Sequence, residues 1–342
     1  MPITGVFFVP SNPNAPTALA VVTERLHTIF DDDPIPVGRW VLEHKLMRDT
    51  PSCFPASASQ RSTNPKYMQF LSLSYYQAHG FIYTSQPPEK SHNSSMPSAV
   101  NPVNATTEAT TSGAPTAAPS QTAGAVAPVA DKSPMVMTTV PLPSCGSLFQ
   151  HFVYAAQPFW CHRHTITVPG GAVYDVGDFR VRIGDVRQTL PTARVRGTVI
   201  EIEWRGPSLI TSITSQYVRS RRTNGLLMVG ELVDDDDDSG IDISFADGIE
   251  EADIDAEYAA TTMLIREFWA KLGIEGAREA SLLPDIGKEV KEQLYKLKQQ
   301  RKPESHTMTN GKQSGQQVEE DPDPTAGVDV ARQFMEIFRF NR

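Results

Sequence analysis

Residues 161–188, CHRHTITVPGGAVYDVGDFRVRIGDVRQ, and residues 192–206, TARVRGTVIEIEWRG, carry the strongest structural signal in the sequence. In both segments apolar and polar side chains alternate, as typical of strands with one buried face. The alternating apolar residues are Phe179, Val181, Ile183, Val195, either Val199 or Ile200, Ile202 and Trp204. The Gly170-Gly171 pair predicts a hairpin turn, and residues 207–214, PSLITSIT, extend the series of predicted strands.

The remaining folded sequence predicts shorter elements. Runs with strand-like composition lie at residues 37–47, 67–76, 80–84 and 135–140. Helical spacing of apolar residues predicts helices at 16–30, 147–156, 255–272 and 328–340. At least seven strands in meander order, with helices mostly near the ends, predict an α+β protein whose antiparallel sheet curls or closes.

The last predicted helix, 328–340, carries an apolar stripe that is too large to leave in water. The stripe consists of Val330, Phe334, Ile337 and Phe338. Asp329 is a candidate N-cap that would fix the start of the helix locally. We therefore expect the helix to pack within the chain, the alternative being a groove of a partner protein.

Composition narrows the class of protein. The 342 residues include 15 Phe, 9 Tyr and 4 Trp, which excludes a wholly disordered chain. Three cysteines, Cys53, Cys145 and Cys161, can form neither a disulfide framework nor a four-thiolate zinc site. Neither a basic leader nor an apolar run of membrane-spanning length is present, so we expect a soluble intracellular protein and no membrane partner.

Three polar segments interrupt the folded sequence. Residues 84–134 are rich in Ala, Pro, Ser and Thr, residues 231–254 form an acidic loop, and residues 298–324 are polar. Such segments bury too little apolar surface to offset the entropy of ordering them. We expect disordered insertions within one discontinuous domain, whose folded parts are about 1–83, 135–218, 255–283 and 325–342.

Common catalytic and metal-binding motifs are absent: the sequence has no Walker loop, no dinucleotide-binding glycine turn and no Gly-x-Ser-x-Gly elbow. In the run 161–164, strand alternation sends Cys161 and Arg163 to one face and the two histidines to the other, which argues against a zinc site. The aspartate run resembles a calcium loop, but Ala246 stands where a bidentate Glu is needed. We therefore expect no metal and no cofactor.

Glu201 and Glu203 are the most serious catalytic candidates. Two carboxylates that are two residues apart on a strand share a face and could hold a divalent metal inside a barrel, while Arg180 and Arg182 could bind phosphate. This would be the chemistry of a barrel-type metal-dependent phosphohydrolase similar to tunnel-type triphosphatases, and it is our alternative function. The interpretation we favour is that both pairs lie on solvent faces of half-buried strands.

Basic residues form two modest clusters. One is Arg219-Ser220-Arg221-Arg222, and the other comprises lysines and an arginine between Lys288 and Lys302 on a helical segment with apolar Val290, Leu294 and Leu297. Solvated helix faces explain both clusters, the alternative for the arginines being a weak nuclear-import signal, so we expect no sequence-specific contact with nucleic acid.

Several segments together resemble subunit 20 of the Mediator complex of RNA polymerase II transcription, in its fungal form. They are MPITGVFFVP followed by a helix, YDVGDFRVRIG, RGTVIEIEW, MLIREFWAKLG and the closing DVARQFMEIFRF. The resemblance rests on their order and spacing and covers about the structured two thirds of the chain.

The resemblance implies a partly open antiparallel β-barrel flanked by helices and used as a scaffold, with no catalytic residues. It also implies a nuclear protein that pairs with Mediator subunit 18 in the head module. Through that module it would contact RNA polymerase II and the TATA-binding protein region of the preinitiation complex.

Overall fold

A computed structural model of the chain describes most of the predicted folded sequence. The described residues are 2–12, 17–30, 33–55, 58, 66–85, 135–157, 159–226, 246, 248–280, 286–299 and 326–339. The predicted insertion 84–134 lies outside them except for its first two residues. The acidic loop 231–254 is described only at 246 and 248–254, and the polar segment 298–324 only at 298 and 299.

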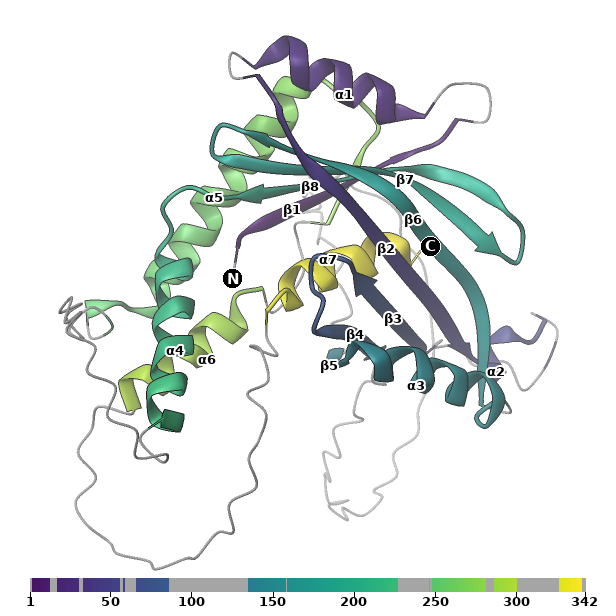
Figure 1. The fold of residues 1–342 in the computed structure, drawn as a ribbon. Helices are drawn as coiled ribbons and strands as arrows, with labels where there is room; N and C mark the ends of the chain where they lie inside the picture. The colour runs from purple at the N-terminus through teal and green to yellow at the C-terminus, as the bar shows by residue number, and fades with distance from the viewer. Residues whose placement is uncertain are drawn as a thin grey trace, which may run out of the picture.

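Nine strands of the described residues form one antiparallel sheet in the order β5-β4-β3-β2-β6-β7-β8-β1-β9. The sheet is strongly curved and does not close (Figure 1), so the prediction of an α+β fold with a partly open barrel is confirmed. The strands are β1 (Thr4–Pro10), β2 (Ile35–Asp49), β3 (Tyr67–Leu73), β4 (His79–Ser85), β5 (Met135–Pro141), β6 (Trp160–Val176), β7 (Phe179–Leu190), β8 (Arg194–Trp204) and β9 (Arg278–Glu279).

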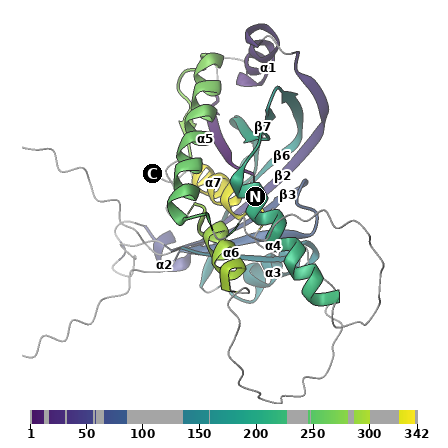
Figure 2. The same ribbon diagram turned by 90° about the vertical axis from the view of Figure 1, so that its left-hand side faces the viewer.

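Helices cover the sheet on both faces. They are α1 (Ala18–Ile29), α2 (Thr50–Cys53), α3 (Leu142–Tyr154), α4 (Leu209–Leu226), α5 (Glu251–Leu272), α6 (Lys288–Gln299) and α7 (Val328–Phe338). Helices α1, α4, α5 and α6 share one apolar core with β1, β7 and β8, and α3 packs on β2 and β3. Helix α7 lies within the concave side of the sheet (Figures 1 and 2). No helix of the described residues is long and apolar enough to cross a membrane.

The predicted hairpin at Gly170-Gly171 is wrong, because β6 runs unbroken through both glycines and turns into β7 only after Val176. The glycine at 171 serves a different purpose. A Cβ there would lie 2.1 Å from Nε1 of Trp40 and 2.6 Å from the carbonyl oxygen of Ile183. That indole nitrogen donates a hydrogen bond to the same carbonyl at 3.2 Å. Gly171 therefore lets the Trp40 side chain lie across the sheet.

The strand expected at 207–214 is also wrong, because α4 begins at Leu209. Its first amides have partners from elsewhere: both oxygens of the Glu257 carboxylate accept hydrogen bonds, from Leu209 N at 3.0 Å and Ile210 N at 3.1 Å. The Ser208 hydroxyl accepts another, from Thr211 N at 3.2 Å. A carboxylate at a helix N-terminus satisfies free amides and complements the dipole, so α5 fixes the start of α4.

Two other helices agree with the sequence more closely. Helix α5 ends at Gly273, in a left-handed conformation as predicted, but it begins at Glu251, four residues early. Glu250 and Asp253 form a capping box there, which accounts for the earlier start. The helical segment predicted around Val290 and Leu294 is α6, and both of these residues are buried.

Candidate functional site: the helix in the concave face of the sheet

Helix α7 is the structural centre of the molecule. It lies across β1 and β3 on the concave side of the sheet, and every residue from Val328 to Phe338 except Glu336 is buried. An amphipathic surface helix buries only one stripe, so α7 is an internal helix. The expectation that this segment packs within the chain is confirmed.

Aromatic side chains anchor the C-terminal half of α7. The Phe334 and Phe338 rings stack on each other with their centroids 5.9 Å apart. Phe334 also lies 6.0 Å from the Trp40 ring, and Phe338 lies 5.5 Å from the His44 ring, both on β2. These contacts place α7 directly against the middle of the sheet.

A buried polar cluster holds the N-terminal half. Asp329 accepts hydrogen bonds from the Tyr258 hydroxyl at 3.0 Å, the Gly287 amide at 3.2 Å and the Arg332 guanidinium at 3.0 Å. Arg332 in turn donates to both carboxylate oxygens of Glu289. The cluster therefore joins α7 to α5 and α6, which are far away in sequence.

Asp329 is not the N-cap that the sequence suggested. The N-cap is Gly327, whose φ of 80° favours glycine and whose Cβ, if present, would meet the Tyr76 ring at 2.4 Å. Burial raises the pKa of Asp329 and Glu289 raises it further, while Arg332 and the bond from Tyr258 lower it. Burial also raises the pKa of Tyr258, so its hydroxyl remains a donor.

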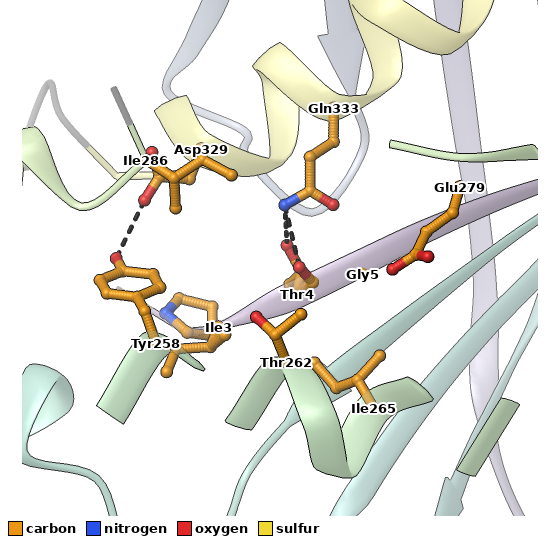
Figure 3. Close-up of a pocket in the computed structure, with 11 residues that line it drawn as sticks. Ile3, Thr4, Gly5, Tyr258, Thr262, Ile265, Glu279, Ile286, Asp329 and Gln333 are labelled. Atoms are coloured by element: carbon orange, nitrogen blue, oxygen red, sulfur yellow. Dashed lines mark hydrogen bonds between the residues drawn. The ribbon is translucent and has the colours of Figure 1, made fainter. Parts of the chain in front are cut away.

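A third contact lies between these two regions, beside a cavity of about 20 Å³ (Figure 3). The Gln333 amide nitrogen donates to the Thr4 carbonyl at 2.9 Å, joining α7 to β1. The cavity is lined by Pro2, Ile3, Thr4, Gly5, Tyr258, Thr262, Ile265, Glu279, Ile286, Asp329 and Gln333. A cavity of this size holds about one water molecule, which is too little for a substrate.

The two candidate acids, Glu201 and Glu203, lie on the concave face and not on a solvent face as we favoured. One Arg182 nitrogen, Nη1, lies 2.7 Å from an oxygen of each carboxylate. The Tyr75 hydroxyl donates to the other Glu201 oxygen at 2.6 Å, and the Arg182 guanidinium lies 4.1 Å from the centre of the Tyr75 ring. The acid pair predicted as exposed therefore shares one arginine in a largely buried network, in which Glu201 is only 1% exposed.

The electrostatics of this network favour charge pairing over metal binding. Burial raises the pKa of Glu201, and Arg182 opposes that shift most strongly. Burial lowers the pKa of Arg182, but Glu201, Tyr75 and Glu203 together raise it above its usual value. Since both Glu201 oxygens already accept short hydrogen bonds, the pair does not fit a divalent ion. Arg180 does not join Arg182, but donates to Asp175 at 2.7 Å.

The histidines of the Cys161–His164 run have separate protein partners. His162 Nε2 lies 3.0 Å from the Thr165 hydroxyl oxygen, and the His164 ring lies 6.0 Å from that of His44. Burial lowers the pKa of His44 to about 4 and that of His164 to about 3. Among the described residues, no three His, Cys, Asp or Glu side chains are grouped to hold a metal ion.

Several lysines of the late helical segment also contact the chain itself. Lys291 pairs with Asp255 at 2.6 Å, Lys298 donates to the Ile249 carbonyl at 2.6 Å, and Lys296 lies over the Tyr217 ring. These contacts hold α6 against α4 and α5. They give most of these lysines a structural role.

Comparison with known proteins identifies the family. The family model described as the TATA-binding related factor of subunit 20 of the Mediator complex matches residues 1–339. The chain belongs to this Mediator subunit 20 family. It is therefore a Mediator subunit in the regulation of transcription.

The other comparisons add little to this assignment. A search of curated proteins found no match. Among solved structures, the PH1819 protein from Pyrococcus horikoshii OT3 is 9% identical, with a TM-score of 0.26 over 60% of this chain and 80% of that chain. A likeness at this level carries no conclusion.

The segments that resemble Mediator subunit 20 meet in the structure. RGTVIEIEW forms all of β8 but its first two residues, and β8 pairs with β1 along the whole of Thr4–Pro10; DVARQFMEIFRF supplies all of α7 but its first residue. Sequence reasoning missed the side chains that hold these parts together, Tyr75, Tyr258, Glu289, Arg332 and Gln333. Only the i,i+3 spacing of Asp329 and Arg332 gave a local signal.

Proposed function

We propose that this Mediator subunit is a non-catalytic scaffold of the head module in the nucleus. The family match over residues 1–339 carries the proposal. Its direct partner is Mediator subunit 18, and its links to RNA polymerase II and the TATA-binding protein run through the module. It has no catalytic residues and does not bind DNA in a sequence-specific manner.

The packed interior supports a scaffold role rather than an enzymatic one. A tunnel-type hydrolase needs a lumen in which carboxylates face a metal and a substrate. In this chain α7 occupies the concave face, and Arg182 pairs with both Glu201 and Glu203 at 2.7 Å. A rigid, filled body suits a subunit that presents surfaces to neighbouring proteins.

Affinity purification of the tagged full chain from nuclear extract tests this proposal. We expect subunit 18 and other Mediator subunits among the recovered proteins, and a one-to-one complex when the two subunits are co-expressed and separated by gel filtration. The same tag on an unrelated nuclear protein is the control. Recovery without any Mediator subunit would overturn the proposal.

A phosphate-release assay tests the enzymatic alternative. The purified chain is incubated with nucleoside triphosphates and magnesium or manganese, beside a variant carrying Glu201→Gln and Glu203→Gln. The scaffold role predicts no release above background from either protein. Turnover that disappears in the double variant would instead support the phosphohydrolase.

We also propose that the folded parts form one domain with three insertions, predicted at 84–134, 231–254 and 298–324 and shorter at their ends, because β4 includes Ser85, α5 begins at Glu251 and α6 extends to Gln299. Ser85 and Met135 are paired neighbours at the end of the β4–β5 ladder, so a two-residue turn can join them. Replacing residues 86–134 by Asn-Gly should not lower the free energy of unfolding, and it should raise it by at most about 3 kcal/mol, since each halving of loop length recovers only about 0.6 kcal/mol of closure entropy. A loss of stability, measured by urea denaturation, would show that the segment packs on the domain.

A further inference from the structure

Two cysteines 108 positions apart in the sequence meet at one end of the sheet. Cys53 is the last residue of α2, directly after β2, and Cys161 is the second residue of β6. Strands β2 and β6 are paired there, with Arg48 opposite Cys161. The Thr50 amide donates to the Phe159 carbonyl at 2.9 Å, which holds α2 over the start of β6.

The short helix brings the two thiols to the same place. The Thr50 hydroxyl oxygen lies 3.5 Å from the Cys161 sulfur, and Cys53 follows Thr50 by three residues in α2 and so lies on the same face of that helix turn. Both cysteines are free and partly exposed, so a small oxidant can reach them. Cys145, the third cysteine, lies on α3 and is buried in the apolar cluster that also contains Phe149.

We propose that Cys53 and Cys161 form a peroxide-responsive dithiol, which closes to an intrachain disulfide that ties α2 to β6. In the first step a Cys161 thiolate attacks hydrogen peroxide: an S–O bond forms, the O–O bond breaks, and hydroxide leaves as water after taking a proton. In the second step Cys53 attacks the sulfenic sulfur, an S–S bond replaces the S–O bond, and a second water leaves. The two thiols are oxidised and the peroxide is reduced to two waters.

Burial and the neighbouring thiol assign Cys53 the second, resolving role. Burial raises the pKa of the Cys53 thiol, Cys161 raises it further, and Arg163 and Arg48 oppose these effects. Because the thiolate is the nucleophile, closure should be faster at pH 8.5 than at pH 6.5. In a reducing compartment the bond would be transient and reversed by cellular thiols.

The test is a peptide map of the full chain under non-reducing conditions. Purified protein at pH 8 receives hydrogen peroxide up to a few equivalents and is then alkylated and digested with chymotrypsin. Aromatic cleavage sites at Phe149, Phe152 and Tyr154 separate Cys145 from Cys161. We expect one crosslinked pair containing Cys53 and Cys161, a mass loss of two hydrogens, and alkylated Cys145.

Matched serine variants and a stability measurement complete the test. Cys53→Ser and Cys161→Ser should each abolish the link, whereas Cys145→Ser should leave it intact. The oxidised chain should melt roughly 5 °C higher than the reduced one, with the rise reversed by dithiothreitol and absent in Cys53→Ser. Independent oxidation of both sulfurs to sulfinic acids, a link between two chains, or a link with unchanged Tm would each overturn the proposal.

Discussion

Replacing Phe334 by alanine tests whether α7 is the core of this subunit. The Phe334 side chain is fully buried, and it packs between the Trp40 ring at 6.0 Å and the Phe338 ring at 5.9 Å. Truncating a buried Phe to Ala removes its transfer free energy and leaves a cavity, at a total cost of about 3–5 kcal/mol. Trp40 is held by its hydrogen bond to Ile183, so it cannot move far into the cavity.

We therefore expect Phe334→Ala to lower the free energy of unfolding by about 4 kcal/mol, towards the middle of that range. For a domain of this size, that corresponds to a fall in Tm of roughly 8–16 °C. Urea denaturation of the isolated subunit, followed by tryptophan fluorescence, measures the change directly. Phe159→Ala is the matched control, because its side chain is 70% exposed and its loss should cost less than about 0.5 kcal/mol.

Two results would refute this reasoning. The first is a Phe334→Ala variant no less stable than the Phe159→Ala control, which would mean that α7 does not pack as described. The second is an isolated variant that keeps its stability and loses only its affinity for subunit 18. That result would move Phe334 from the core of the chain to an interface between subunits.

Further substitutions test other contacts in the interior of the chain. Glu201→Gln should cost roughly 2–4 kcal/mol in urea denaturation because it leaves Arg182 buried with less charge compensation, and a loss below 1 kcal/mol would contradict the pairing. The pKa of His44 is about 4 in the folded chain, below its value in the unfolded chain, so the unfolded chain binds the proton first as pH falls. The free energy of unfolding should therefore fall between about pH 6.5 and pH 4, by up to about 1.4 kcal/mol per pH unit. His44→Gln should flatten that slope. Gly171→Ala should destabilise strongly because its Cβ would lie 2.6 Å from a backbone oxygen, whereas the neighbouring Gly170→Ala, with nothing nearer than 3.8 Å, should be tolerated; equal melting temperatures would refute this contact.

Local patterns identified most of the elements correctly. Period-two alternation predicted β7 and β8, helical spacing predicted α1, α5 and α7, and Gly273 marked the end of α5. These signals succeed because each depends on residues within one or two turns or along one strand. The same patterns failed where a residue far away in the sequence determines the local conformation. Within 207–214, the residues from Leu209 onward form a helix whose first amides are capped by Glu257. Gly171 lies inside a strand, where it leaves room for the Trp40 side chain.

Local patterns in the sequence were enough to predict an α+β protein with an antiparallel sheet, and the order of its segments resembles one Mediator subunit. Which faces of the sheet are buried depends on long-range packing, which these patterns do not contain. Alternation in β8 placed Glu201 opposite Ile200 and Ile202 but could not say that a second layer covers the acidic side. That layer is built by α7 and by Tyr75 in the turn after β3, both more than a hundred residues from β8 in the sequence. Charge burial depends on such long-range contacts, because a carboxylate enters the interior only when a partner such as Arg182 accompanies it.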